Sequence, residues 1–154
     1  MTDFNKEIDK VMSLISQKGI AVLSTSYNDC VTSRTMSVVT FDNKVAFQTS
    51  KYMRKYCQIL ENENVALCLG DIQLEGIAKD KGKAAEHAKF ISLYKEKHPG
   101  SYKAYTNLES ERVLEIQPTY IQVWKYIDGK PHILKMDIIN KIATLIPYYD
   151  GDHY

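Results

Sequence analysis

Short β-rich runs separated by tight turns constrain the fold of this chain more than any other feature. The runs are rich in Val, Ile, Thr and Phe, and the turn pairs Asn28-Asp29 and Asp42-Asn43 lie between them. Closely spaced strands of this kind favour a barrel or a sandwich. The predicted strands are residues 20–26, 31–41, 44–49, 65–69 and 72–78.

Helical patterns flank and interrupt these strands. Apolar residues at helical spacing predict a helix over residues 4–18 that ends at Gly19, and a second helix over residues 52–61. A third helix is predicted over residues 82–98, followed by a short helical or irregular segment to Leu108. The buried face predicted for this third helix is formed by Ala84, Ala88, Ile91 and Lys95.

The last third of the chain returns to β character. Residues 113–127 form a predicted strand with Pro118 at an edge or bulge position, and residues 132–136 begin another strand after the turn Asp128-Gly129. The sequence therefore predicts one α+β domain, residues 1–154, with a mainly antiparallel sheet and flanking helices.

Composition excludes several classes of partner. The net charge of +1 gives no general attraction for nucleic acid or anionic membranes, and no stretch has membrane-spanning length or the pattern of a signal peptide.

The cysteines, Cys30, Cys57 and Cys68, are odd in number and lack a C-x-x-C pair, which argues against disulfides and a zinc ribbon. The glycines form no dinucleotide or P-loop motif, the histidines lack zinc-helix spacing, and no metal is predicted. We therefore expect a soluble cytoplasmic protein.

The start of the helix over residues 52–61 carries cations where acids are normally favoured. Lys51, Arg54 and Lys55 occupy this end without an acid among them, although helix N-termini attract negative charge. First-turn N–H groups, together with the hydroxyls of Thr49 and Ser50, suit a phosphate. The sequence thus predicts the anchor of a phosphorylated cofactor.

Arg34 joins this group through the alternation of its strand. A period of two puts it on one face with Thr32, Met36 and Val38, beside apolar neighbours. An isolated arginine in such a position more often pairs with an acid at a sheet edge, and that alternative stays open. Its combination with the cationic helix start favours a phosphate site.

These residues resemble the flavin mononucleotide (FMN)-binding split β-barrels of the pyridoxamine 5′-phosphate oxidase type. The resemblance rests on residues 34–39 (RTMSVV), 47–50 (FQTS), 54–55 (RK), 58–62 (QILEN) and 64–67 (NVAL). It implies that Arg34, Thr49, Arg54 and Lys55 hold the flavin phosphate and that the arginine strand runs beside the flavin ring. Gln73 resembles a glutamine that reaches the flavin from a neighbouring strand. The implied FMN-binding set is Arg34, Thr35, Met36, Ser37, Val38, Gln48, Thr49, Ser50, Arg54, Lys55, Gln73 and Trp124. The resemblance also implies a homodimer with flavin at the interface.

The family pattern is incomplete where the true oxidases bind substrate. Val39 stands in place of a lysine for the substrate phosphate, and the C-terminal signature after Trp124 reads Lys130, His132 and Leu134, with one basic position lost. Vitamin B6 oxidation is therefore not expected. The resemblance implies an FMN-dependent oxidoreductase acting on an unidentified small molecule, or alternatively a flavin carrier or redox sensor without turnover. Haem and deazaflavin remain open as other ligands.

No catalytic residue is predicted, because an oxidised flavin itself accepts a hydride. Trp124 and Tyr126 border the substrate side in one interpretation and fill the core in the other, which is commoner for aromatic residues in strands. His132 similarly packs or hydrogen-bonds more often than it catalyses, although it matches the C-terminal histidine of the family.

Overall fold

The computed structural model describes residues 1–152, and its first element confirms the predicted N-terminal helix. Helix α1 (Phe4–Lys18) begins after Asp3, whose side chain accepts a hydrogen bond from the backbone N–H of Lys6. It ends at Gly19, which adopts the left-handed conformation with φ 64°. Its buried face includes Ile8, Val11, Met12 and Ile15. No helix in residues 1–152 is both long and apolar enough to cross a membrane.

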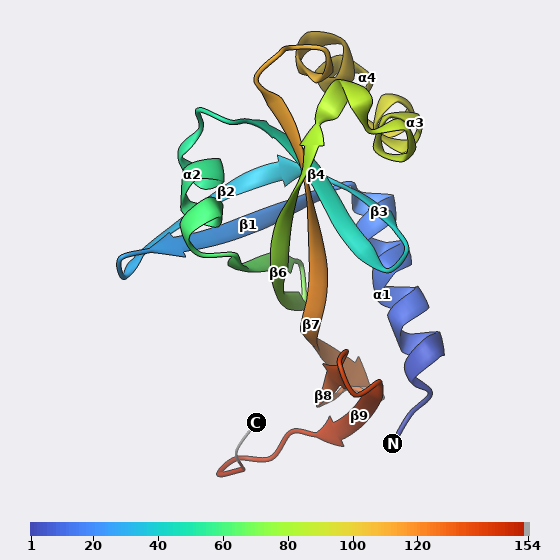
Figure 1. The fold of residues 1–154 in the computed structure, drawn as a ribbon. Helices are drawn as coiled ribbons and strands as arrows, with labels where there is room; N and C mark the ends of the chain where they lie inside the picture. Colours follow the sequence, from blue (N-terminus) through green and yellow to red (C-terminus); the bar gives the residue numbers. More distant parts are fainter. Residues whose placement is uncertain (153–154) are drawn as a thin grey trace.

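One open antiparallel sheet forms the body of the molecule (Figure 1). The strand order is β2-β1-β5-β6-β7-β4-β3, with β8 paired to β7 and β9 paired to β8. The α+β, mainly antiparallel prediction is confirmed. The strands are β1 (Ile20–Tyr27), β2 (Cys30–Ser37), β3 (Val39–Phe41), β4 (Lys44–Ser50), β5 (Asn64–Leu69), β6 (Ile72–Lys83), β7 (Glu111–Ile127), β8 (Lys130–Asp137) and β9 (Ile142–Pro147).

The junction at Val38 explains why the sheet curls into a split barrel. β2 and β3 are consecutive in the chain and separated by this one residue, yet they lie at opposite ends of the seven-strand order. The sheet must therefore curl until its two ends approach each other. Val38 donates its backbone N–H to the carbonyl of Gly19 at 2.9 Å, and the single strand predicted over residues 31–41 is two strands.

The predicted turns follow from residues that tolerate positive φ. Asn28, Asp29, Asp42 and Asn43 all have φ between 49° and 61°, as two-residue hairpin turns require. The Asp128-Gly129 turn is likewise confirmed. β9 was not predicted from the sequence.

The strand pairing shifts register beside Pro118, as predicted for a bulge. Gly76 lies opposite Pro118, and the register shifts between Glu75 and Gly76. A Cβ atom at Gly76 would lie 2.6 Å from the carbonyl oxygen of Gln117, so the close approach of β7 requires glycine there.

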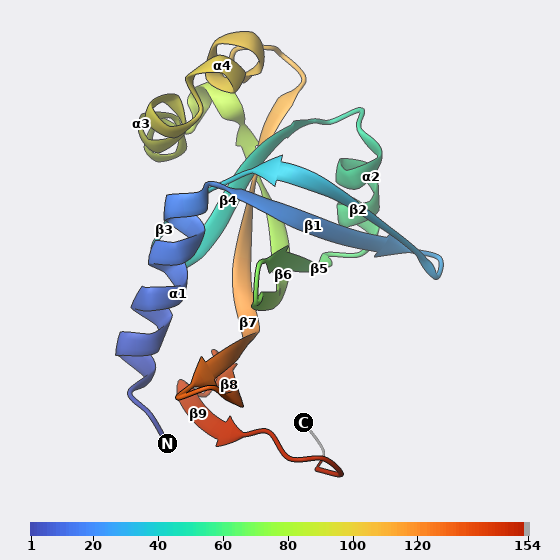
Figure 2. The ribbon, with the colours of Figure 1, turned by 180° about the vertical axis from the view of Figure 1, so that it is seen from behind.

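Helix α2 (Arg54–Glu61) lies beside β1 and β2 (Figures 1 and 2) and begins two residues later than predicted. The helix predicted over residues 82–98 is wrong in its first part, because β6 continues to Lys83. A short 3₁₀ turn (Ala84–Glu86) and then α3 (Ala88–Lys97) follow. The buried side of α3 is formed by Phe90 and Tyr94 rather than by the predicted face. The predicted helical segment before Leu108 is present as α4 (Pro99–Ser101) and a π-helical turn (Tyr102–Thr106).

Two apolar clusters fill the interior. The larger cluster packs α1 and α2 against the concave side of the sheet and includes Leu23, Phe47, Leu74 and Ile121. The smaller cluster joins α3 to β3, β4 and β7 through Val39, Ala46, Phe90, Tyr94 and Val113. β4 therefore has an apolar layer on both faces.

Candidate anion-binding site

Arg34 points from β2 toward the side of the sheet that α2 covers. It lies opposite Leu23 of β1, which is fully buried, and its side chain is half-buried. Nη1 donates to the carbonyl of Leu23 at 3.3 Å and to Thr25 Oγ1 at 2.8 Å, and Nη2 donates to Thr32 Oγ1 at 2.6 Å. These contacts hold the guanidinium against its own sheet.

The contacts leave one edge of the guanidinium free within residues 1–152. Three of its five N–H groups are used, and the Nε–H and one Nη2–H remain without a protein acceptor. No acid in this part of the chain forms a salt bridge with Arg34, so the alternative of an acid-paired arginine is not what the structure contains. A side-on pair of N–H groups is the arrangement that binds carboxylate or phosphate oxygens.

Gln58 of α2 fixes the two hydroxyls that hold Arg34. Its Oε1 accepts from Thr25 at 2.5 Å and from Thr32 at 2.7 Å. Gln58 is buried, and neither it nor Thr25 or Thr32 was predicted to hold Arg34. The alternation of the strand places Thr32 on the same face as Arg34. This shared face was the one sequence signal that could have identified Thr32 as a partner of Arg34.

Lys55 brings the other end of the sheet to the same place. It lies in the first turn of α2, is 8% exposed, and donates from Nζ to Thr49 Oγ1 of β4 at 3.3 Å. Arg34 belongs to β2 and Thr49 to β4. These two predicted site residues therefore lie on opposite sides of the split between the two ends of the sheet. The Lys55–Thr49 hydrogen bond brings two residues of the predicted set together.

Charge at this site is poorly balanced. Burial lowers the pKa of Lys55, and the positive charge of Arg34 lowers it further, whereas Glu111 acts in the opposite direction. Burial also lowers the pKa of Arg34, and the positive charge of Arg54 lowers it further. Glu111 is itself buried, and burial raises its pKa although Lys55 opposes this. Lys55 and Arg34 are thus two partly desolvated cations that repel each other, the exposed Arg54 adds to the repulsion at Arg34, and one acid lies near Lys55.

The N-terminus of α2 adds donors to this cationic group. No side chain caps it and its first turn contains no acid, so the N–H groups of its first residues have no partner within the helix. Ser50 Oγ instead accepts from the backbone N–H of Tyr52 at 3.2 Å. Arg54 is exposed, and its Nη2 donates to Cys30 Sγ at 3.3 Å.

Other residues of the predicted set lie around this group in different directions. Thr35 is exposed on the outer side of β2, while Met36 packs on the main core and Val38 is buried in it. Ser37 is hydrogen-bonded to Tyr94. Gln48 points to the opposite side of β4 from Thr49: it accepts from Thr106 Oγ1 at 2.7 Å and donates to the carbonyl of Ser101 at 3.5 Å.

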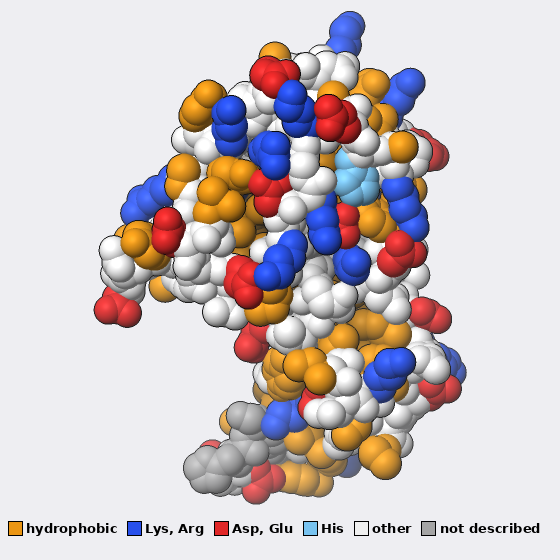
Figure 3. All heavy atoms as spheres, viewed as in Figure 1, with side chains coloured by type: hydrophobic (Ala, Val, Ile, Leu, Met, Phe, Trp, Pro, Cys, Tyr) orange, Lys and Arg blue, Asp and Glu red, His pale blue; other side chains and the backbone are white. Residues whose placement is uncertain are grey.

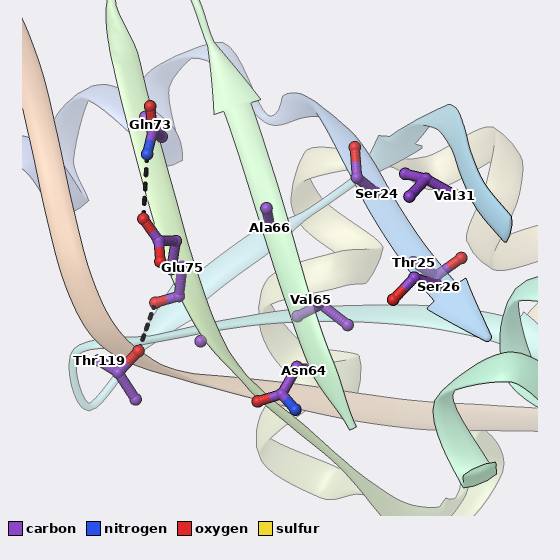
Figure 4. A pocket seen from close by; sticks show the side chains of 11 residues that line it. Ser24, Thr25, Ser26, Val31, Asn64, Val65, Ala66, Gln73, Glu75 and Thr119 are labelled. Atoms are coloured by element: carbon purple, nitrogen blue, oxygen red, sulfur yellow. Dashed lines mark hydrogen bonds between the residues drawn. The ribbon is translucent and has the colours of Figure 1, made fainter. Parts of the chain in front are cut away.

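Gln73 lies on the outer face of the sheet, away from Arg34. It lines an open pocket of about 430 Å³ across β1, β5 and β6 and donates to Glu75 at 3.0 Å (Figure 4). Figure 4 also shows Ser24 and Ala66 facing this pocket. Within one chain, Gln73 is therefore not brought together with the cationic group.

Trp124 lies farther along the same outer face. It lines another pocket of about 440 Å³ with Leu14 and Lys18 of α1, and its ring contacts Tyr126 and Tyr148 at centroid distances of 6.2 and 5.3 Å. It is half-buried and so is neither a core residue nor a fully exposed one.

The positions where the family pattern is incomplete are mostly buried. Val39 belongs to the smaller apolar cluster and Leu134 to the larger one, with 2% and 1% exposure. His132 Nδ1 hydrogen-bonds the carbonyl of Lys130 at 2.9 Å within its own strand. Neither apolar side chain can contact a ligand on the surface.

The molecular surface has no large patch of one charge on the face seen in Figure 3. Lys and Arg side chains there alternate with Asp and Glu, while hydrophobic side chains gather around β8 and β9. The mixture of charges on this face agrees with the net charge of +1.

Comparison with solved structures identifies the fold. Neither family models nor curated protein sequences match this chain. General stress protein 26 from Bacillus anthracis is 24% identical, with a TM-score of 0.61, over 84% of this chain and 99% of that one. A pyridoxamine 5′-phosphate oxidase-related, FMN-binding protein from Nostoc punctiforme is 11% identical, with a TM-score of 0.64, over 97% and 98%.

The chain has the split-barrel fold of pyridoxamine 5′-phosphate oxidase-like proteins. A heme-binding protein from Mycobacterium smegmatis has the same core: it is 9% identical, with a TM-score of 0.67, over 89% of this chain and 58% of that one. The fold resemblance read from residues 34–67 is thus confirmed. The split barrel alone does not specify the ligand, because its members include an FMN-binding and a heme-binding protein.

Proposed function

We propose that this split-barrel protein binds FMN and that Arg34, Thr49, Arg54 and Lys55 hold the phosphate. The observation that carries the proposal is the group of mutually repelling cations, without a salt-bridge partner in residues 1–152, at the split of the sheet. A phosphate dianion would relieve this repulsion. The FMN-binding Nostoc punctiforme protein of the same fold supports the choice of a flavin.

The donors present fit a phosphate group. The free edge of Arg34 offers two N–H groups, Lys55 is a desolvated ammonium, and the first turn of α2 offers backbone N–H groups. Thr25, Thr32 and Gln58 keep the guanidinium in place before any ligand arrives. The site is thus organised in advance, which reduces the entropy lost on binding.

We propose hydride or electron transfer to an unidentified small molecule as the reaction. FMN supplies the redox chemistry when bound. The side chains of this chain bind and orient it, with the backbone of residues 34–38 beside the ring, and we assign no acid or base.

The separation of Gln73 and Trp124 from Arg34 leads us to propose a homodimer. Both residues lie on the outer face of the sheet, whereas the cationic group lies at the split. A second chain packed on this face would bring its Gln73 and Trp124 to the flavin bound by the first chain.

We also propose a cytoplasmic location, since Cys30, Cys57 and Cys68 are exposed free thiols.

A non-catalytic flavin carrier or redox sensor is the second candidate. It is favoured by the burial of Val39 and Leu134, which removes two positions where the true oxidases present basic groups to substrate. A turnover rate with NADH or NADPH above that of free FMN would exclude this candidate.

The first test is a visible absorption spectrum of the protein purified without added cofactor, followed by chromatography of any released pigment. Released FMN supports the proposal. A haem or deazaflavin spectrum, or no FMN binding on reconstitution, contradicts it.

A second test changes one proposed phosphate ligand. Arg54→Ala should weaken FMN binding by about 1.5–3 kcal/mol, while Lys89→Ala, which removes an exposed cation paired with Asp42, should not.

A further inference from the structure

A pocket of about 400 Å³ lies between the β1–β2 turn and α2, next to the proposed phosphate site. Two of the chain's three cysteines, Cys30 and Cys57, line it together with Arg54, Gln58 and Glu61. Two thiols, a guanidinium and a carboxylate thus share this cavity. The proposed flavin chemistry assigns no role to its thiols.

Cys30 is the thiol in direct contact with a cation. Arg54 Nη2 donates to its sulfur at 3.3 Å, and the sulfur is accessible to solvent. In thiol–disulfide exchange a negatively charged sulfur attacks a disulfide, and Cys30 is open to such a reagent. The same cation attracts reagents that carry carboxylates.

The other two cysteines differ from Cys30 in their surroundings. Cys57 Sγ donates to the carbonyl of Lys51 at 3.8 Å, which keeps its hydrogen engaged. Cys68 lies on β5, is also exposed, and donates to the carbonyl of Gly70 at 3.9 Å, with no hydrogen bond from a cation in residues 1–152. Cys68 is therefore a comparison thiol without a neighbouring cation; because it lies on the outer face of the sheet with Gln73, its rate is measured at a dilution where the chain is monomeric.

Polar groups suited to a zwitterion surround Cys30. Gln58 is 6% exposed, and its Oε1 is already occupied by Thr25 and Thr32, so its amide N–H groups are the polar atoms left for this pocket. Arg54 suits a carboxylate and Glu61 suits an ammonium group. The pocket therefore combines a nucleophilic sulfur with groups for both charges of an amino-acid-like molecule.

We propose that Cys30 is a site of thiol–disulfide exchange with small disulfides that carry carboxylate and ammonium groups, and that Arg54 directs them to it. The Cys30 thiolate attacks one sulfur of the disulfide RSSR. A bond forms between Cys30 Sγ and that sulfur, the RS–SR bond breaks, and RS⁻ leaves. Cys30 is oxidised to a mixed disulfide, and half of the reagent is reduced to a thiol.

The test uses the purified full chain and oxidised glutathione, with peptide mapping by mass spectrometry over time. Glutathionylation should be at least about tenfold faster at Cys30 than at Cys68. The uncharged bis(2-hydroxyethyl) disulfide should show a smaller preference. Equal rates at the two cysteines, or faster modification of Cys57, overturn the proposal.

Arg54→Gln supplies the decisive comparison. It should slow glutathionylation of Cys30 to about the rate at Cys68, without changing the rate at Cys68, while an unchanged circular dichroism spectrum shows that the chain remains folded. An unchanged rate at Cys30 overturns the role of Arg54. Cys57→Ser should leave the Cys30 rate unchanged. Because Arg54 is also a proposed phosphate ligand, the test uses the chain freed of bound flavin, and its readout, a mass on a thiol, requires no flavin.

Discussion

At the scale of single residues, the proposed site combines binding groups that are unfavourable for the unliganded protein. The folded state lowers the pKa of Lys55 below its ordinary value of 10.5, through burial first and the charge of Arg34 second. A base with a lowered pKa contributes stability only above its unfolded pKa, and that contribution is lost as the pH falls through the folded pKa. At neutral pH the charged lysine therefore costs stability, and a bound anion offsets this cost.

Arg34→Lys tests the geometry of the anchor separately from its charge. Lysine keeps the positive charge but lacks the two parallel N–H groups of the free guanidinium edge. We expect FMN affinity to fall by about 1.5–3 kcal/mol, or roughly 10- to 150-fold, as measured by quenching of flavin fluorescence. An affinity equal to that of the parent chain would place the phosphate elsewhere.

Glu111→Gln tests the electrostatic account through pH. Burial raises the pKa of Glu111 above its ordinary 4.5, and above that folded value its negative charge partly compensates Lys55. Sulfate, whose charge is constant in this range, should bind the parent chain more tightly as the pH falls through this pKa. The variant should bind sulfate tighter at neutral pH, by roughly 1 kcal/mol, and show little change on acidification.

The stability of the same variant gives an independent reading. A carboxyl with a raised folded pKa contributes stability that is present below its unfolded pKa and is lost as the pH rises through the folded pKa. Glu111→Gln should therefore raise the melting temperature at neutral pH and not at acidic pH. Calorimetry of both proteins at the two pH values decides this, and a lower melting temperature at neutral pH would contradict the assignment.

Sequence reasoning found the charged residues of the site but not the groups that orient them. Lys55 and Arg34 were identified because cations at a helix start and an arginine between apolar residues break local rules. Thr25 and Gln58 break no such rule, and their hydrogen bond joins residues 33 positions apart. Glu111 was likewise missed, because its effect depends on burial and on its proximity to Lys55, which tertiary packing creates.

At the scale of elements, α2 is held by a clamp of three side chains. Asp80 of β6 accepts from the Tyr56 hydroxyl of α2 at 2.5 Å, from Arg112 of β7 at 3.0–3.2 Å and from the backbone N–H of Gly82 at 2.8 Å. Tyr56 directly follows Lys55. The clamp therefore positions the turn of helix that carries the proposed phosphate ligands.

Asp80→Asn should loosen this clamp. Burial alone would raise the pKa of Asp80, but the hydrogen bonds from Tyr56, Gly82 and Arg112 lower it below 3.8. Its stabilising contribution is thus present above the unfolded pKa and is lost as the pH falls through the folded pKa. We expect the free energy of unfolding to drop by about 2 kcal/mol at neutral pH and the difference to shrink in acid, as measured by urea titration.

Asp42→Asn is the matched control for the clamp. Asp42 pairs with Lys89 on the surface, where such pairs contribute little. This change should leave both the unfolding free energy and FMN affinity close to those of the parent chain. A comparable loss in both variants would mean that the clamp has no special role.

The elements that were predicted correctly have local signals, and the errors have tertiary causes. Helix α1 has a capping Asp3 and a terminal Gly19, and its predicted bounds match the structure. The break at Val38 has no glycine or proline to mark it, because closure of the barrel imposes it. Similarly, β6 extends to Lys83 because Lys83 pairs with Arg112 of β7, a contact that helical periodicity does not reveal.

At the scale of the whole molecule, the outer face of the sheet is the part that a monomer explains least. Val22 of β1 and Val31 of β2 are 38% and 69% exposed, beside the pocket that contains Gln73. Apolar residues grouped on an exposed sheet face favour contact with another protein surface. A two-fold dimer through this face would repeat each contact twice and create two equivalent sites.

Mixing two defective chains tests whether the proposed sites are shared between subunits. Arg34→Ala alone should bind FMN weakly, and so should a chain with both Gln73→Ala and Trp124→Ala. In a mixed dimer with shared sites, one site has Arg34 from the second chain and Gln73 and Trp124 from the first, so it is intact, while the other site carries all three changes. Unfolding and refolding the two chains together should therefore restore tight FMN binding to a fraction of the sites, measured by equilibrium dialysis, whereas each chain refolded alone should show none. If each site were built within one chain, every chain in the mixture would remain defective and no tight binding would appear.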